Sequence, residues 1–519
     1  MKRRNFLQHT TQAVALPFLL NGFQVSALTR SHLFRSLNPE NDRVLVLVQL
    51  NGGNDGLNMV VPIDQYDGIM AVRENIALPE NSVLPLTDTT ALHPRMQGMQ
   101  QLYQDGLLGV IQSVGYPNQN RSHFRSTDIW TSGSPADEVW PSGWLGRYMD
   151  GLYPGYPEGY PNTEYPDPFA IVMGSSLVSQ TCQGTAANYC LALEDPFNLG
   201  SILEGEGGSV PDTPYGDELQ FIRTAIAQTN AYSEVVAAAA EAGANLGDYP
   251  EDNRLAQQLR NVALLIAGGL QTKIYVVTLG GFDTHANQIT ATDTTTGDHA
   301  NLLGILSDAV AAFQHDLNAL GLQERVLGMT FSEFGRRIRS NDSFGTDHGT
   351  AAPLILFGNC VEPQVLGESP EIDVEVDIQE GVPMQYDFRD VYGSILTDWF
   401  EVEEETVRAL LHEGFVHLPI LRDCSLVNSI RPIIVPELEV QVYPNPFREQ
   451  VMARFISERE AVRVSLFDAL GSEIRTVLNR RLPAGQHDVY IEGHGLPGGV
   501  YYVRVQAGQR VKTLRVVKA

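Results

Sequence analysis

The stretch RVLVLVQLNGGNDG, residues Arg43–Gly56, decides the fold. Its first eight residues form a near-continuous apolar run, which is typical of a strand buried on both faces of a parallel sheet. The run ends in a polar, glycine-rich turn that contains Asp55. Three further runs have the same character, namely KIYVVTL at Lys273–Leu279, RVLGMTF at Arg325–Phe331 and PLILF at Pro353–Phe357. The sequence therefore predicts a mostly parallel sheet flanked by polar loops.

Two amphipathic helices are predicted between these strands. One covers Leu255–Leu270, and the other begins near His299 and keeps apolar residues at helical spacing as far as Leu320. Strands that alternate with helices favour a doubly wound α/β sheet. In such sheets ligands collect beyond the carboxyl ends of the strands. We therefore expect the functional residues in the loops at that edge.

Acidic and histidine side chains occupy these loops. They are suited to zinc, manganese, calcium or magnesium. The candidate ligands of one or two such divalent ions are Asp55, Asp283, His285, Asp347, His348 and His299. Two neighbouring ions can hold the attacking and the leaving oxygen during displacement at phosphorus or sulfur. Glu333 could be a ligand, a base or an ion-pair partner of Arg336.

Each candidate also has a structural interpretation, which the sequence leaves open. The Gly-Asn-Asp-Gly run around Asp55 is a common turn. Asp347 could cap a helix, and Glu333 could form a surface ion pair at helical spacing. His299 could be a hydrogen-bonded core histidine. The candidates support one another because they flank comparable ends of the predicted sheet.

Composition narrows the class of protein. The chain has 519 residues, 43% of them hydrophobic, and a formal net charge of -27. This apolar content excludes a mainly disordered chain, and no apolar run reaches the roughly 18 residues of a transmembrane helix. The first 40 residues and residues 438–519 each carry a net charge of +4, so residues 41–437 carry -35. A body this acidic disfavours a nucleic-acid partner.

The first 30 residues predict an export signal. A basic start at Lys2–Arg4 precedes a moderately apolar run from Ala13 to Phe23. The run Arg3-Arg4-Asn5-Phe6-Leu7 resembles a twin-arginine signal, and the alternative is an ordinary secretory signal with a chance arginine pair. The twin-arginine interpretation implies a chain that folds before export and takes its metal from the cytoplasm.

Residues 438–519 predict a small β-sandwich after a proline-marked linker at 426–437. Short alternating strands are expected at Val451–Phe455, Val462–Phe467, His487–Ile491, Val500–Val505 and Lys512–Val517. The motifs at Val442–Phe447, Leu496–Tyr502 and Lys512–Lys518 resemble the type IX secretion sorting domain. That resemblance implies passage across an outer membrane, followed by release or attachment at the cell surface. The alternative is a generic carbohydrate-binding or adhesion sandwich.

Residues 41–425 resemble the bacterial family called domain of unknown function 1501. The motifs that carry the resemblance are Leu47–Asn58, Ser122–Phe124, Asp128–Trp130, Gly143–Tyr148, Gly280–His285, Ser332–Arg336, Thr346–Ala351 and Tyr386–Tyr392. This family is similar to the alkaline phosphatase and sulfatase superfamily, whose members hydrolyse or transfer phosphate or sulfate groups. The resemblance implies an alkaline-phosphatase-like α/β sandwich with metal ions at the strand ends.

The resemblance also implies a nucleophile at a helix start. Ser122 is the candidate, because it precedes an expected helix whose first N–H groups can hold an anion. Arg121 or Arg125 would bind an equatorial oxygen of the substrate. The sequence departs from the sulfatase pattern, since neither Cys-x-Pro-x-Arg nor Ser-x-Pro-x-Arg occurs. Ser122 could instead act only as a helix cap.

Cys182 and Cys190 are candidates for a local disulfide, because an exported protein meets an oxidising environment. Together these features predict an exported, metal-dependent hydrolase of a phosphate or sulfate ester, acting on a small molecule or a glycan. Its further partners would be the twin-arginine and type IX export machineries, and its location the cell surface or the medium, reached through the periplasm. The alternative is a non-catalytic surface-binding protein on the same fold.

Overall fold

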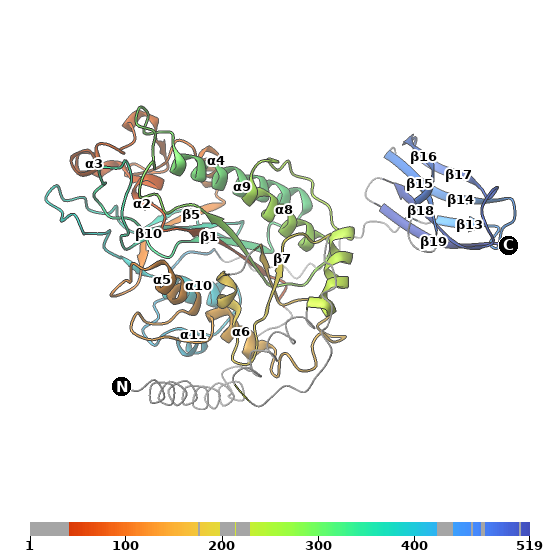
Figure 1. The fold of residues 1–519 in the computed structure, drawn as a ribbon, viewed down its shortest axis with the longest axis horizontal. Coiled ribbons are helices and arrows are strands. Elements are labelled where there is room, and N and C mark those ends of the chain that lie inside the picture. Colours follow the sequence, from red (N-terminus) through yellow and green to blue (C-terminus); the bar gives the residue numbers. More distant parts are fainter. Residues whose placement is uncertain are drawn as a thin grey trace. The chain divides into compact units, whose positions relative to one another are not determined.

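The computed structural model describes residues 41–174, 177–197, 213, 229–422, 438, 440–457, 460–468, 473–507 and 510–519. The predicted export signal at 1–30 and the predicted linker at 426–437 lie outside these residues. The chain divides into two compact units, Met1–Ser425 and Leu426–Ala519. We call the first the body and the second the C-terminal unit, and each is described by itself (Figure 1).

A nine-stranded sheet forms the centre of the body, in the order β11-β5-β10-β9-β1-β8-β6-β7, with β12 paired to β5. The strands are β1 (Val44–Asn51), β5 (Leu108–Gly115), β6 (Ala170–Met173), β7 (Cys190–Leu193), β8 (Ile274–Gly280), β9 (Val326–Phe331), β10 (Ala352–Phe357), β11 (Val365–Leu366) and β12 (Tyr386–Asp387). From β9 to β7 all neighbours are parallel. Only β10 runs antiparallel to its two neighbours, β5 and β9. The predicted α/β class with a mostly parallel sheet is therefore confirmed.

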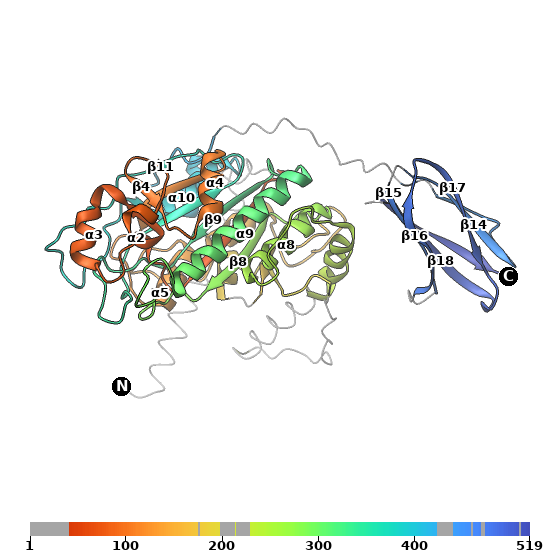
Figure 2. The ribbon, with the colours of Figure 1, turned by 90° about the horizontal axis from the view of Figure 1, so that it is seen from above.

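Apolar side chains cover both faces of this sheet. In β1, Leu45 and Leu47 belong to one core, whereas Val46 and Val48 belong to the other. The first core packs against α5 (His123–Ser132), α6 (Trp144–Leu152), α10 (Phe388–Asp398) and α11 (Glu404–Leu410). The second packs against α4 (Gln97–Gln104), α8 (Arg254–Ala267) and α9 (Asp298–Leu320). Figure 1 shows these helices as two layers with the sheet between them, and Figure 2 shows α8 and α9 from above, on one face of the sheet.

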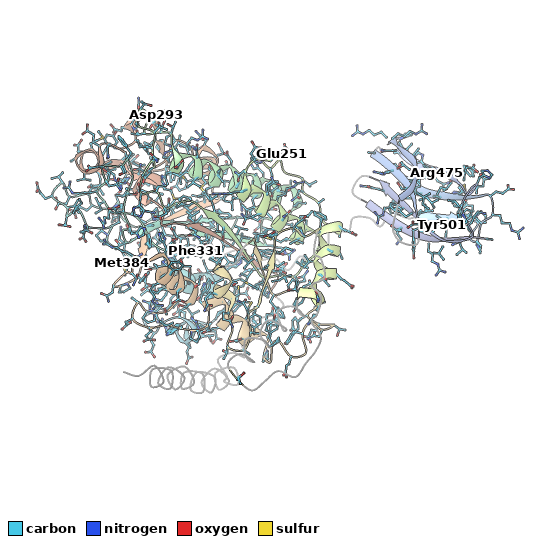
Figure 3. All side chains as sticks on the ribbon, in the orientation of Figure 1. Glu251, Asp293, Phe331, Met384, Arg475 and Tyr501 are labelled. Carbon is cyan, nitrogen blue, oxygen red and sulfur yellow. The ribbon has the colours of Figure 1, made fainter. Side chains whose placement is uncertain are left out.

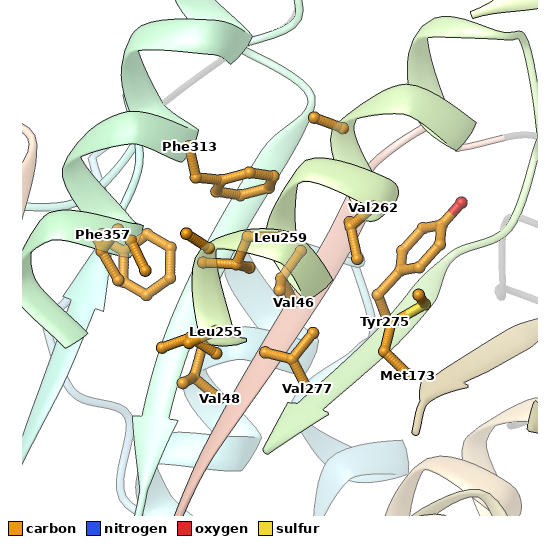
Figure 4. Packing of buried hydrophobic residues seen from close by; sticks show 14 of the residues in the cluster. Val46, Val48, Met173, Leu255, Leu259, Val262, Tyr275, Val277, Phe313 and Phe357 are labelled. Carbon is orange, nitrogen blue, oxygen red and sulfur yellow. The ribbon is translucent and has the colours of Figure 1, made fainter. Parts of the chain in front are cut away.

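Figure 4 shows part of the second core, where Leu255, Leu259 and Phe313 of α8 and α9 lie against Val46 and Val277 of the sheet. Each such side chain contributes about 1.5–3 kcal/mol when fully buried. The two helices match the predicted amphipathic stripes, and β1, β8, β9 and β10 match the predicted apolar runs. Strong periodicity thus places the main elements.

A smaller sheet, β2-β4-β3, lies beside the loop after β1. Its strands and the neighbouring short helices are α2 (Gly56–Met59), β2 (Val60–Pro62), η2 (Ile63–Gln65), α3 (Tyr66–Arg73), η3 (Glu80–Ser82), β3 (Leu84–Pro85) and β4 (Thr90–Leu92), and a further 3-10 helix, η4 (Leu177–Cys182), precedes β7. The α3 helix carries Arg73, which is fully buried. This segment therefore brings a buried charge close to the first loop.

The C-terminal unit is built from two antiparallel sheets, β13-β14-β17 and β16-β15-β18-β19. Their strands are β13 (Val440–Tyr443), β14 (Gln450–Ser457), β15 (Glu460–Phe467), β16 (Glu473–Leu482), β17 (Gly485–Glu492), β18 (Gly499–Ala507) and β19 (Arg510–Lys518). Alternate residues such as Val451, Val464 and Val503 form one core. Arg475 of β16, labelled in Figure 3, is an exposed residue of this unit. The predicted all-β unit is confirmed, with β13 and β16 in addition to the five predicted strands.

The predicted disulfide between Cys182 and Cys190 is not formed, since both thiols are free within the described chain. The two thiols nevertheless lie in contact, at the end of η4 and the start of β7. Burial, and after it the hydrogen bond to Cys182, raise the pKa of the Cys190 thiol well above its usual value. The thiolate is the reactive form, so the raised pKa makes the Cys190 thiol poorly reactive. Cys360, in contrast, is disulfide-bonded.

Among the described residues, no helix has both the length and the hydropathy needed to cross a bilayer.

Candidate metal centre

Strand direction brings five loops to one edge of the sheet. The parallel strands β1, β8 and β9 all end there. Because β10 is antiparallel to β9, its beginning lies at the same edge, and Asp347 and His348 directly precede it. Because β5 is antiparallel to β10, its end lies there too and leads into α5, which begins at His123. Functional residues from distant segments can therefore meet at this edge.

Three histidines and one aspartate converge at this edge, and we call them the metal centre: His123, Asp283, His285 and His348. The Nε2 atoms of His123, His285 and His348 lie 3.5, 3.1 and 3.2 Å from Asp283 Oδ1. The Nε2 atoms of His285 and His348 are 3.0 Å apart. Metal-ligand atoms of His123, Asp283 and His348 all lie within 4.8 Å of one another. Donor atoms this close to one another are suited to a shared ion.

The other ring nitrogen of each histidine fixes which atom carries the proton. His348 Nδ1 lies 2.8 Å from the main-chain oxygen of Arg121. His285 Nδ1 lies 3.0 Å from Asp347 Oδ1, and His123 Nδ1 lies 2.7 Å from Glu333 Oε1. Carbonyl and carboxylate oxygens only accept hydrogen bonds, so each Nδ1 donates. In the neutral rings, all three Nε2 atoms therefore present lone pairs.

The positions of these Nε2 lone pairs indicate whether a cation fits at the metal centre. Facing lone pairs on His285 and His348 Nε2, 3.0 Å apart, repel one another unless a proton or a cation lies between them. His123 Nε2 is buried and makes no hydrogen bond to any described residue. Three imidazole nitrogens and one carboxylate are a common ligand set for a transition metal, and an oxygen acceptor on the opposite nitrogen is the usual outer partner. The residues fit a divalent ion.

Arg336 links three loops at this edge, namely the loop after β1, the loop after β8 and the loop between β9 and β10. Its guanidinium is fully buried and donates to the main-chain oxygens of Gly53 (2.6 Å), Phe282 (2.9 Å) and Thr346 (2.9 Å). It also lies 2.7 Å from Asp283 Oδ1. Burial acts to raise the pKa of Asp283, but the hydrogen bond and charge of Arg336 outweigh it and hold that pKa below its usual value. Asp283 is therefore kept ionised, as a metal ligand must be.

The loops approach so closely that one of them needs glycine. Gly52 has φ +126°, and a Cβ atom there would lie 2.3 Å from the main-chain nitrogen of Asp283. Its N–H donates to Glu333 Oε1 at 2.9 Å. Glu333 is only 1% exposed and also receives the Nδ1 proton of His123. That hydrogen bond raises the pKa of His123, although burial opposes it. Glu333 is thus an outer partner of His123.

Asp347 takes the corresponding position beside His285. One carboxylate oxygen accepts from His285 Nδ1, and the other lies 3.0 Å from Arg337 Nη1. Burial acts to raise the pKa of Asp347, and the hydrogen bond from His285 is the largest of the effects that lower it below its usual value. The structure therefore brings Asp283, His285 and His348 of the predicted ligands together and places Asp347 directly behind them.

Asp55 and His299, which the sequence also predicted as ligands, lie elsewhere. Asp55 is buried and forms an ion pair with Arg73 at 3.1 Å. His299 Nε2 lies 2.9 Å from Asn54 Oδ1 and therefore donates its proton to that oxygen. Burial lowers the pKa of His299 to about 4. This second group of polar residues, unlike the metal centre, offers no free lone pair from His299 Nε2.

The predicted catalytic residues Ser122 and Arg125 differ in position. Ser122 immediately precedes His123, is exposed, and makes no side-chain capping hydrogen bond within the described chain. Arg125 lies one turn on, where its guanidinium contacts Asp128 and the main-chain oxygens of residues 135–138. The structure therefore leaves Ser122 beside the centre and engages Arg125 away from it.

His123 is a candidate ligand that the sequence analysis did not single out. It follows β5, whose apolar pattern is interrupted by Gln112 and Ser113, so this strand was not predicted. Ser113 also has a positive φ of 51°, which is unusual in a strand. The available signal was the position of His123 next to Ser122 in a family motif.

These observations define a class: an α/β body with a histidine-rich candidate metal centre, followed by a β-sandwich unit. Residues 88–398 match the family described as protein of unknown function (DUF1501), and the chain belongs to this family. Residues 441–519 match the secretion system C-terminal sorting domain. The protein is therefore exported, to the cell surface or the medium. No sequence among the curated proteins matches the chain.

Solved structures are similar to parts or most of this chain at low identity. The PsFucS1 sulfatase from Pseudoalteromonas sp. is 9% identical, with 91% of this chain and 87% of that chain covered and a TM-score of 0.33. A protein in the alkaline phosphatase superfamily from Vibrio parahaemolyticus is 10% identical, with 94% and 86% covered and a TM-score of 0.29. PorZ of Porphyromonas gingivalis, a surface component of the type IX secretion system, is 23% identical over 15% of this chain and 11% of its own length, with a TM-score of 0.12.

Proposed function

We propose that this protein is an exported metal-dependent hydrolase of a phosphate or sulfate ester. The observation that carries the proposal is the convergence of three imidazole lone pairs and one ionised carboxylate at the metal centre. Among the four ions predicted from the sequence, three imidazoles favour zinc, because calcium and magnesium prefer oxygen ligands. A zinc ion held by His123, Asp283, His285 and His348 would act as a Lewis acid toward an ester oxygen.

Two arginines beside the centre support an anionic substrate. The main-chain oxygen of Arg121 receives the His348 proton, and Arg337 lies 3.0 Å from Asp347. Burial lowers the pKa of Arg121, and the nearby charge of Arg337 lowers it further. The Arg121 guanidinium donates to the main-chain oxygen of Gln379 at 2.6 Å, and an anion bound beside the two arginines would offset the repulsion between their charges. Guanidinium groups match the oxygens of phosphate and sulfate well.

Ser122 is our candidate nucleophile, with a water molecule as the alternative. Its exposed hydroxyl belongs to the residue before α5, a helix of 10 residues, and the helix start adds partial positive charge to the same place. The attacking oxygen gives up its proton and forms the new bond to phosphorus or sulfur, while the bond to the ester oxygen breaks and that oxygen leaves with a proton. If Ser122 attacks, a water molecule then displaces its oxygen in the same way, which releases phosphate or sulfate and restores the hydroxyl. Arg121 and Arg337 would neutralise charge on the oxygens that do not leave.

The test combines metal analysis with hydrolysis assays. Protein purified without chelators should contain a divalent ion, and it should hydrolyse at least one member of a panel of aryl phosphate, phosphonate and sulfate esters. His123→Ala and His348→Ala should lose both the ion and the activity. The matched control is His315→Ala, because His315 is an exposed histidine of α9.

Two results would contradict the proposal. If the wild type carries no ion, the metal centre does not exist. If it carries the ion but hydrolyses no ester, the favoured interpretation is the non-catalytic surface-binding protein that uses the same centre.

A further inference from the structure

We infer that Asp55, Arg73 and Gln288 form a buried positioning network that sets the spacing of the metal-ligand loops, and that the body binds a single ion. The inference rests on the proposed metal centre. It assigns to Asp55 a role different from the ligand role that the sequence predicted. The name Asp55 network is used below for these three residues.

The carboxylate of Asp55 is fully engaged by the other two members. Arg73 Nη1 lies 3.1 Å from Asp55 Oδ1 and 3.2 Å from Oδ2, and Gln288 Nε2 donates to Oδ2 at 2.6 Å. All three side chains are at most 1% exposed. A second divalent ion on Asp55 would have to lie next to the Arg73 guanidinium, whose positive charge repels it. Asp55 therefore neutralises an arginine in place of a metal.

Gln288 joins this carboxylate to both ligand loops. Since its amide nitrogen donates to Asp55, its carbonyl oxygen faces the hydroxyls of Thr284, at 3.1 Å, and Thr346, at 2.8 Å. Thr284 lies between Asp283 and His285, and Thr346 directly precedes Asp347 and His348. One buried amide thus fixes the two segments that supply three of the four proposed ligands.

Arg73 makes further contacts to the loop between β9 and β10. Its Nε donates to the main-chain oxygen of Ile338 at 2.9 Å, and its Nη2 donates to that of Arg337 at 3.0 Å. Arg337 in turn holds Asp347, which accepts the proton of His285. The Asp55 network therefore contacts the segments that carry the proposed ligands, and through Arg337 it also supports Asp347, the outer partner of His285.

The first experiment counts ions. Wild-type protein and Asp55→Asn are loaded with zinc, passed through a desalting column and measured for zinc per chain. We expect one ion per chain in both, because the asparagine oxygen still accepts from Gln288 while no ligand is removed. Two ions in the wild type and one in Asp55→Asn would overturn the inference and make Asp55 a ligand.

The second experiment tests positioning with Gln288→Met, which keeps the Asp55–Arg73 ion pair and the approximate size of the side chain. We expect zinc affinity, measured by competition with a chromogenic chelator, to fall about 10–100-fold, the usual effect of losing an outer partner. The visible spectrum of the cobalt-loaded protein should also change, which reports ligand geometry and not overall stability. An unchanged affinity and spectrum would overturn the inference.

Gln314→Met is the matched control. Gln314 is also a buried glutamine of the body, 3% exposed, and its Nε2 has no partner in the described chain. This variant should keep the wild-type zinc affinity and cobalt spectrum. Hydrolysis is not used as a readout, so a chain that binds one ion but cleaves no ester contradicts the proposed function and leaves this inference supported. Two ions with Asp55 among the ligands would contradict this inference without contradicting the proposed function.

Discussion

Two groups of acidic and histidine residues lie at the same edge of the sheet, and they differ in what surrounds them. The metal centre is half-exposed, with Asp283 48% exposed, and its histidines direct lone pairs toward one point. The Asp55 network and the neighbouring His299 are buried. Asp55 is ion-paired with Arg73, and His299 donates its Nε2 proton to Asn54. Aspartate and histidine side chains occur in both groups. What separates a ligand from a structural residue is the partner on its other side.

The largest effect on the buried group is expected from the loss of Arg73. Arg73→Met should reduce the free energy of unfolding by about 3–5 kcal/mol, because it leaves the Asp55 carboxylate buried without its counter-charge. Urea denaturation in the presence of a chelator measures this without any contribution from bound metal. Arg260→Met, at an exposed position of α8, should change stability by no more than about 0.5 kcal/mol. A loss below about 1 kcal/mol for Arg73→Met would show that the ion pair is not structural.

Low pH should destabilise the folded protein, because His299 is buried in its neutral form. Burial lowers its folded-state pKa to about 4, whereas the unfolded chain has the ordinary value of about 6.5. Between these values the unfolded chain takes up a proton that the folded chain does not. The stabilisation is therefore complete above pH 6.5 and is lost as the pH falls, by about 3 kcal/mol near pH 4.

Urea denaturation of chelator-treated protein at several pH values measures this slope. His299→Asn should make the slope shallower, whereas His315→Asn, at an exposed position of the same helix, should not; part of the slope remains because burial also lowers the pKa of His93, to about 3. An equal slope in wild type and His299→Asn would mean that the neutral buried imidazole is not the source of the acid sensitivity.

The loss of a proposed ligand should show that only the metal centre, and not the buried group, binds zinc. His348→Ala should weaken zinc binding by more than about 100-fold, beyond the loss typical of outer partners. His299→Asn should retain zinc binding, because its Nε2 proton is donated to Asn54. Chelator competition on both variants provides the measurement. Loss of zinc in both would mean that the groups act as one site.

The smallest effect is expected at an outer partner. Glu333→Gln keeps an oxygen that can accept from Gly52 and His123 but removes the negative charge that makes His123 a more basic ligand. Zinc affinity should fall about 10-fold, the lower end of such effects. A loss as large as that of His348→Ala would instead place Glu333 among the ligands.

The main strands and the edge that they define were predictable from the sequence. The runs that became β1, β8, β9 and β10 are apolar on both faces, and the polar residues beside them had to meet at one edge. The sorting unit was also predictable, because two-residue alternation is strong in strands such as β14 and β18. β16 was not predicted, since its sequence EIRTVLNRRL is rich in exposed charge.

The division of the candidates into ligands and structural residues was not predictable. Nothing in the sequence near Asp55 shows that Arg73 will be buried against it, because that contact depends on how α3 packs. His123 was missed for a related reason, since it becomes a neighbour of His348 only through the pairing of β5 with β10. Tertiary contacts, and not local patterns, decide these roles.

The reversed direction of β10 has a consequence for how the protein obtains its ion. It brings together residues as far apart as Arg121 and His348, which are 227 positions apart in the chain. An unfolded chain holds these donors far from one another, so it cannot offer the full ligand set to any ion. For the proposed metal centre, the metal pool that supplies an ion would therefore be that of the compartment where the body folds, which need not be the compartment where the protein works.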